Sequence, residues 1–149
     1  MVTIEQLKQL RELTGISISE CKKALEEARG NLQEAKELLK KRGKEIAEKK
    51  QAREVGEGLV ASYTHSTGKL GVLVDARCET DFVGRSPDFK NLCHELALQI
   101  ASMNPQGVEE LLGQPYVKDP SRKVQDIVND TIAKLGENIV VKRFSRFEI

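Results

Sequence analysis

Two stretches in the middle of the chain, residues 59–65 and 70–76, have the composition of β-strands and are separated by only four residues. The connecting segment, residues 66–69, contains a glycine, and a short turn of this kind is typical of a β-hairpin. Since a hairpin joins antiparallel strands, it argues against a parallel sheet with crossover helices. The sequence therefore predicts a fold built on a small antiparallel sheet.

The C-terminal tail predicts one more strand. Residues 139–147 are rich in β-branched and aromatic side chains. The alternation of apolar and polar positions slips between Val141 and Phe144, which predicts a β-bulge.

Two helices are expected between the hairpin and the tail. Ser86 followed by Pro87 is typical of a helix start, and residues 119–121 are expected to open a second helix that ends at Gly136. The apolar stripe of the first helix consists of Phe89, Leu92, Cys93, Leu96, Ile100 and Met103. The order strand, strand, helix, helix, strand predicts an α+β domain in residues 58–149, with helices covering the sheet.

The first 42 residues predict a separate domain of three short helices. Each helix is preceded by a capping residue and followed by a glycine, at positions 15, 30 and 43. The apolar stripes of the second and third helices consist of Cys21, Ala24, Leu25, Ala28, Leu32, Ala35, Leu38 and Leu39. Residues 43–57 are interpreted as a basic linker helix between the two domains.

The charge balance argues against a dedicated nucleic-acid binder. The chain has 24 basic and 23 acidic side chains, whereas such proteins usually carry a clear basic excess. The basic stretch from Lys40 to Arg53 has no interleaved aromatic residue for base stacking. No apolar run approaches the roughly 18 residues of a membrane span, and no secretory signal is evident. We expect a cytoplasmic protein that binds neither membranes nor nucleic acid directly.

The residue patterns of common catalytic sites are missing from the sequence. Cys93 and His94 are adjacent on a predicted helix, so their side chains diverge by about 100° and cannot form a nucleophile–base pair. The three cysteines and two histidines lack the spacing of a zinc site, and no phosphate-binding glycine loop is present. We expect a binding protein rather than an enzyme, with no cofactor, no metal and no catalytic residue.

Apolar residues in polar segments are then the informative ones. Ile16 fits a hydrophobic staple that folds back on Cys21, whereas Ile18 lies off the apolar stripe and is the better contact candidate. Phe82 follows an acidic residue at the end of the hairpin. It either folds back under the sheet or projects into solvent, and the residues alone leave both open.

Several segments together resemble the bacterial elongation factor Ts family. They are "LRELTGISISECKKALEEARGNLQEAKELL", "SYTHSTGKLGVLV", "GVLVDARCETDFVGRSPDF", "LLGQPYVKD" and "KLGENIVVKRFSRFEI". They follow the order of the family and cover nearly the whole chain. The resemblance implies a ubiquitin-associated-like three-helix domain before the core. It also implies a guanine-nucleotide exchange factor that binds elongation factor Tu and releases GDP from it.

The resemblance also implies site residues. Thr80, Asp81, Phe82 and Val83 correspond to the segment that disturbs the Mg²⁺ and phosphate site of elongation factor Tu. Further partner contacts are implied for Ile18, Ser19, Lys22, His65, Leu135 and Gly136.

The chain departs from the family pattern in three respects. Residues 17–20 read Ser-Ile-Ser-Glu where the family usually has Gly-Met-Met-Asp, so only one bulky contact residue is retained. A helical arm of longer members is reduced to residues 106–111. The chain carries one copy of the core module, whereas the longest members carry two, and we therefore expect a homodimer.

Two other functions fit parts of the chain. An adaptor with a ubiquitin-associated-like domain would explain the N-terminal helices but not residues 58–149. A translation-associated RNA binder would explain the basic stretch but predicts a basic net charge, and the net charge is only +1.

Overall fold

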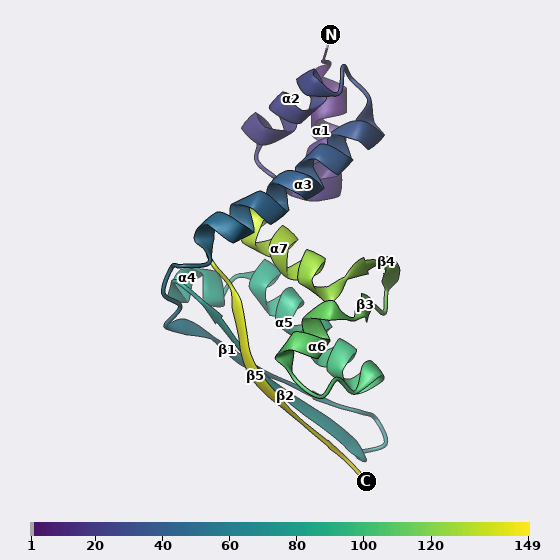
Figure 1. Ribbon diagram of the computed structural model, residues 1–149, viewed down its shortest axis with the longest axis vertical. Coiled ribbons are helices and arrows are strands. Elements are labelled where there is room, and N and C mark those ends of the chain that lie inside the picture. The colour runs from purple at the N-terminus through teal and green to yellow at the C-terminus, as the bar shows by residue number, and fades with distance from the viewer. Residues whose placement is uncertain (1) are drawn as a thin grey trace.

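The computed structural model describes residues 2–149 and is elongated, with the two termini at opposite ends (Figure 1). Helices α1 (Ile4–Thr14), α2 (Ile18–Glu27) and the first half of α3 (Leu32–Lys50) form the N-terminal end. The sheet and its covering helices form the other end. No helix in residues 2–149 is long and apolar enough to cross a membrane.

The N-terminal helices form as their caps and stripes predict. Thr3 and Gln6 form a capping box at α1, Gly15 ends that helix in the left-handed conformation, and Asn31 caps α3. Their stripes meet in one buried cluster, which consists of Leu10, Cys21, Ala24, Leu25, Ala28, Ala35 and Leu39. Ile16 packs against the edge of this cluster, which agrees with the hydrophobic-staple interpretation.

The expected helix end at Gly43 is wrong, because α3 continues without interruption to Lys50. Gly43 is buried, and a Cβ there would lie 3.7 Å from the Cβ of Ala133 on α7 (Val124–Leu135). Packing of the two helices therefore outweighs the roughly 1 kcal/mol by which glycine disfavours a helix. Ala47, one turn further along α3, belongs to the core of the sheet domain. The boundary predicted after residue 42 thus falls inside a helix that contributes to both ends of the molecule.

The predicted hairpin is confirmed. Strands β1 (Glu57–Thr64) and β2 (Leu70–Cys78) pair antiparallel, and β5 (Val140–Glu148) pairs antiparallel with the other edge of β2. The predicted bulge is also confirmed: Arg143 pairs with Asp75 and Val141 with Ala76, so one residue of β5 is left over between them.

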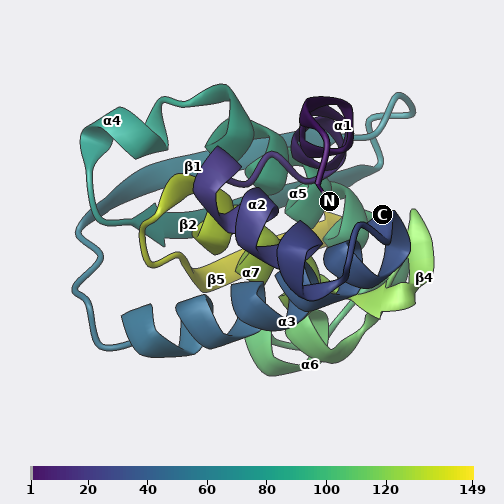
Figure 2. The same cartoon turned by 90° about the horizontal axis from the view of Figure 1, so that it is seen from above.

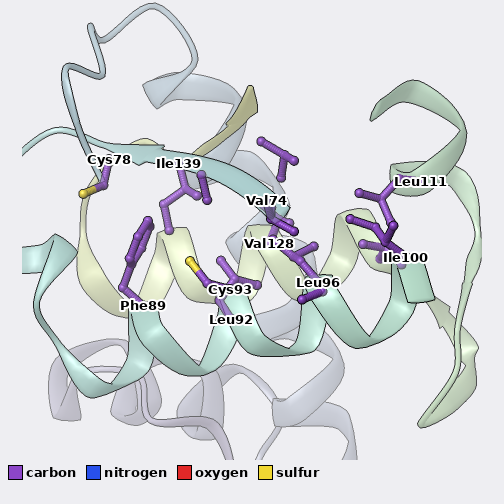
Figure 3. Packing of buried hydrophobic residues seen from close by; sticks show 14 of the residues in the cluster. Val74, Cys78, Phe89, Leu92, Cys93, Leu96, Ile100, Leu111, Val128 and Ile139 are labelled. Carbon is purple, nitrogen blue, oxygen red and sulfur yellow. The ribbon is translucent and has the colours of Figure 1, made fainter. Parts of the chain in front are cut away.

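Helices cover one face of this sheet (Figures 1 and 2). Helix α5 (Pro87–Met103) packs against β1 and β2, and α6 (Val108–Gly113) and α7 lie on the same side of the sheet. Figure 3 shows the α5 side chains Phe89, Leu92, Cys93, Leu96 and Ile100 among residues of β2, α6 and α7. The α+β prediction is thereby confirmed. Met103, expected on the buried stripe, is exposed because it is the last residue of α5.

The expected helix start at residues 119–121 is wrong. Strand β4 (Asp119–Lys123) occupies this segment and pairs with β3 (Pro115–Tyr116). Helix α7 begins only at Val124, where the side chain of Asp126 accepts a hydrogen bond from the backbone N–H of Lys123 at 2.9 Å. Because residues 119–123 pair with β3, the helix begins after them and not at residues 119–121.

Candidate partner-binding site

The segment after β2 forms a single helical turn, α4 (Asp81–Gly84), rather than an irregular loop. Thr80 is its N-cap, and the Thr80 hydroxyl accepts a hydrogen bond from the backbone N–H of Val83 at 3.2 Å. The hydroxyl of Ser86 donates to the carbonyl of Val83 at 2.7 Å. The turn is thus capped at its start and tied to the beginning of α5.

The turn exposes Phe82 and buries Val83. The side chain of Phe82 is 80% exposed, whereas that of Val83 is 6% exposed and belongs to the core of the sheet domain. Of the two readings left open for Phe82, the structure selects the projecting one. Asp81 is also exposed and pairs with Arg85 at 3.1 Å. Three of the four residues expected here, Thr80, Asp81 and Phe82, are on the surface, and Val83 is not.

The underside of the turn is closely packed. Gly84 is buried, and a Cβ there would lie 3.5 Å from both the Cys78 sulfur and the carbonyl oxygen of Gly58. The thiol of Cys78 donates to the carbonyl of Thr80 at 3.2 Å. Burial, together with the charge of Glu137, raises the pKa of Cys78 to about 11, so the thiol is neutral at physiological pH. The buried side of the turn therefore packs against a neutral thiol and the backbone of Gly58.

Glu137 was not predicted as a site residue, yet its side chain is hydrogen-bonded to the residues that begin the turn. Its carboxylate accepts hydrogen bonds from the backbone N–H groups of Glu79 (3.1 Å) and Thr80 (2.9 Å), and from the Thr80 hydroxyl (2.7 Å). Leu135 and Gly136 precede Glu137 directly, so the fold brings these two predicted site residues next to the turn. Glu137 and Thr80 are 57 positions apart, and no local sequence signal marks their contact.

The other predicted residues lie away from the turn. Ile18, Ser19 and Lys22 are exposed on α2, near the N-terminal end of the molecule (Figure 1). His65 is exposed where β1 enters the hairpin turn, and its Nδ1 atom lies 3.1 Å from the Thr67 hydroxyl. The structure therefore places the candidate contacts in three separate regions along the long axis.

The sheet face opposite α5 carries exposed apolar side chains, namely Val60, Leu73 and Phe147. In the register of the sheet, Leu73 pairs with Ser62 of β1 and with Ser145 of β5. We call this surface the outer sheet face. Exposed apolar residues on one face of a sheet are candidates for a protein–protein contact.

Asp75 is buried beneath two arginines on the outer sheet face. Arg77 donates two hydrogen bonds to its carboxylate, at 2.6 and 3.1 Å, and Arg143 donates one at 3.1 Å. The bond from Arg77, supported by Arg143, holds the pKa of Asp75 below its ordinary value, although burial acts in the opposite direction.

The cysteines have the properties of core residues. All three are buried and free, and burial raises the pKa of Cys93 to about 12. The interpretation of Cys93 as a core residue is confirmed. Within residues 2–149 there is no group of three potential metal-ligating side chains.

Comparison with known proteins decides the family. A model of the family described as "Elongation factor TS" matches residues 79–149. The elongation factor Ts of Coprothermobacter proteolyticus is 42% identical over an alignment that covers 99% of this chain and 98% of that protein. The chain belongs to the elongation factor Ts family. The resemblance inferred from the sequence segments is confirmed, and the chain is a translation elongation factor.

Other members of the elongation factor Ts family agree. The proteins of Thermoanaerobacter pseudethanolicus and Thermotoga neapolitana are 38% and 37% identical, with 99% of this chain and 95% and 97% of theirs covered. These alignments extend over 193 and 191 positions, more than the 149 residues of the chain. These elongation factors Ts therefore carry segments that have no counterpart here.

Proposed function

We propose that this chain binds elongation factor Tu in its GDP-bound state and promotes release of GDP, so that GTP can bind. The observation that carries the proposal is the large exposed side chain of Phe82 on a short helical turn, which is anchored by the buried residues Val83 and Gly84. An exposed aromatic residue on a rigid support loses little conformational freedom when it enters a partner, which makes it an efficient contact residue.

The proposed mechanism involves no covalent chemistry. Asp81 and Phe82 enter elongation factor Tu near the Mg²⁺ ion and the phosphates of GDP. An aspartate rearranges the oxygen ligands around Mg²⁺, and a phenylalanine fills the apolar gap that opens. The exposed ion pair of Asp81 with Arg85 is weak, as surface pairs generally are, so Asp81 is free to exchange this partner for another.

Thermodynamic linkage then accounts for exchange. A protein that prefers the nucleotide-free form of elongation factor Tu lowers the affinity of elongation factor Tu for GDP. GDP in turn lowers the affinity of elongation factor Tu for that protein by the same ratio. Binding of GTP therefore displaces the exchange factor at the end of the cycle.

The remaining predicted contacts have a docking role in this proposal. Ile18, Ser19 and Lys22 on α2 form the N-terminal contact, and Leu135 and Gly136 form a contact beside the α4 turn. Because α3 joins these two regions as one continuous helix, their separation is fixed before elongation factor Tu binds.

We further propose that the chain forms a homodimer through the outer sheet face. Pairing two copies would bury Val60, Leu73 and Phe147, which are exposed in the single chain. A two-fold symmetric contact is the common form of such an interface. In the dimer, His65 of one subunit and the α4 turn of the other would belong to one binding surface.

A nucleotide-release assay tests the proposal. Elongation factor Tu loaded with fluorescent GDP is mixed with the chain and excess unlabelled GDP, and the fluorescence decay is followed. The proposal predicts that release accelerates with chain concentration and saturates. A release rate that is independent of chain concentration contradicts it.

A further inference from the structure

The loop between α7 and β5 is locked to the segment that begins the α4 turn. Besides the three hydrogen bonds that Glu137 accepts from Glu79 and Thr80, a bond runs in the opposite direction. The carboxylate of Glu79 accepts from the backbone N–H of Asn138 at 2.6 Å. Each segment thus supplies a carboxylate to the backbone of the other, which fixes their relative position.

The same loop is joined to the end of α3. The buried side-chain amide of Asn138 donates to the carbonyl of Arg53 at 2.9 Å. The guanidinium of Arg53 lies 3.6 Å from the Glu79 carboxylate. Lys50, the last residue of α3, donates to the carbonyl of Gly136 at 2.8 Å. A continuous set of polar contacts therefore connects the end of α3 with the α4 turn. The first half of α3 packs against α1 and α2.

We infer that Glu137 is a positioning residue for nucleotide exchange, which fixes the direction in which Asp81 and Phe82 project. The inference rests on the proposed function. A turn of four residues makes few hydrogen bonds of its own, and the backbone N–H groups at its start need acceptors. Glu137 supplies them from a different part of the fold. A group that must push into a partner is effective only when such supporting contacts hold it in place.

Variants of Glu137 separate the reach of the side chain from its charge. Glu137→Gln is uncharged but keeps an oxygen that can accept from the two backbone N–H groups. Glu137→Asp keeps the charge but is one methylene shorter and cannot span the same distance. Glu137→Ala removes both, and Glu109→Ala on α6 is the control for loss of a surface glutamate.

The release of fluorescent GDP from elongation factor Tu is measured over a range of concentrations of each variant. This yields a maximal rate and a half-maximal concentration. We expect Glu137→Ala and Glu137→Asp to lower the maximal rate about tenfold, since the side chain no longer reaches the backbone N–H groups of Glu79 and Thr80 and those hydrogen bonds are lost. The half-maximal concentration stays within about twofold, because docking through α2 is unchanged. Glu137→Gln and Glu109→Ala behave like the original chain.

Each alternative outcome has a distinct meaning when Phe82→Ala is measured in parallel. If Phe82→Ala slows release and Glu137→Ala does not, the positioning inference is wrong and the proposed function stands. If Glu137→Asp is active and Glu137→Gln is not, charge rather than reach matters, and the inference is again wrong. If neither Phe82→Ala nor Glu137→Ala slows release, both the positioning inference and the proposed mechanism through the α4 turn are wrong. The proposed function itself fails only if the original chain does not accelerate release. Should Glu137→Ala fail to fold, the contrast between Gln and Asp still decides.

Discussion

Phe82 and Val83 are consecutive residues of one helical turn, yet the first is 80% exposed and the second 6% exposed. Successive side chains of a helix point about 100° apart, so the turn presents one residue to a partner and anchors the other in the core. This arrangement separates a variant that affects stability from a variant that affects binding.

Val83→Ala should lower the free energy of unfolding by about 2 kcal/mol, because it removes two buried methyl groups and leaves a cavity. Urea denaturation measures the change. An unchanged urea midpoint would show that Val83 does not anchor the turn.

Deletion of residues 1–42 should raise the concentration needed for half-maximal exchange and leave the remainder folded. The deletion removes the whole N-terminal cluster but retains Gly43 and Ala47, which pack at the sheet domain. Exchange is measured as a function of concentration, and circular dichroism checks the fold. Ile18→Ser, at an exposed position of α2, is the matched point variant. An unchanged concentration dependence for both variants rules out docking through the N-terminal helices.

The chain should be a dimer at micromolar concentration, with a mass about twice 16.6 kDa by light scattering. Leu73→Lys should yield the monomer mass, since it places a charge in the centre of the outer sheet face, where burial of an unpaired charge is costly. Leu73 is exposed in the single chain, so the substitution should not disturb its fold. A monomer mass for the original chain leaves the proposed dimer without support.

Asp75→Asn should reduce stability more at pH 7 than at pH 3. The pKa of Asp75 is lowered in the folded chain, so its ionised form stabilises the fold above the unfolded pKa of about 3.9. This contribution is lost as pH falls through the lower folded pKa. Urea denaturation at both pH values measures the difference, with Glu109→Gln as a surface control. A difference that is equally large at pH 3 contradicts the role of the Asp75 charge.

The parts of the fold that local sequence determines could be predicted. Thr3, Asn31 and Ser86 cap helices as expected because a cap is formed by residues within the same turn. The hairpin followed from the composition of two strands and the turn between them. The prediction at Gly43 was wrong because packing against Ala133, 90 positions away, determines the helix there.

The candidate site, too, could be predicted only in part from local sequence. The sequence indicated that Phe82 was unusual, but its direction depends on how α4 rests on Cys78 and Gly58. The role of Glu137 depends on a contact between distant segments. Neither could be read from neighbouring residues, because both depend on the completed fold.

The proposed exchange mechanism depends most on Phe82, and Phe82→Ala tests this mechanism most directly. The variant should keep the thermal transition of the original chain, since the side chain is exposed. Truncation of a central aromatic contact costs on the order of 2 kcal/mol or more, so release of fluorescent GDP from elongation factor Tu should slow by about thirtyfold or more at subsaturating concentrations. A folded Phe82→Ala variant that releases GDP at the original rate would contradict the proposed mechanism.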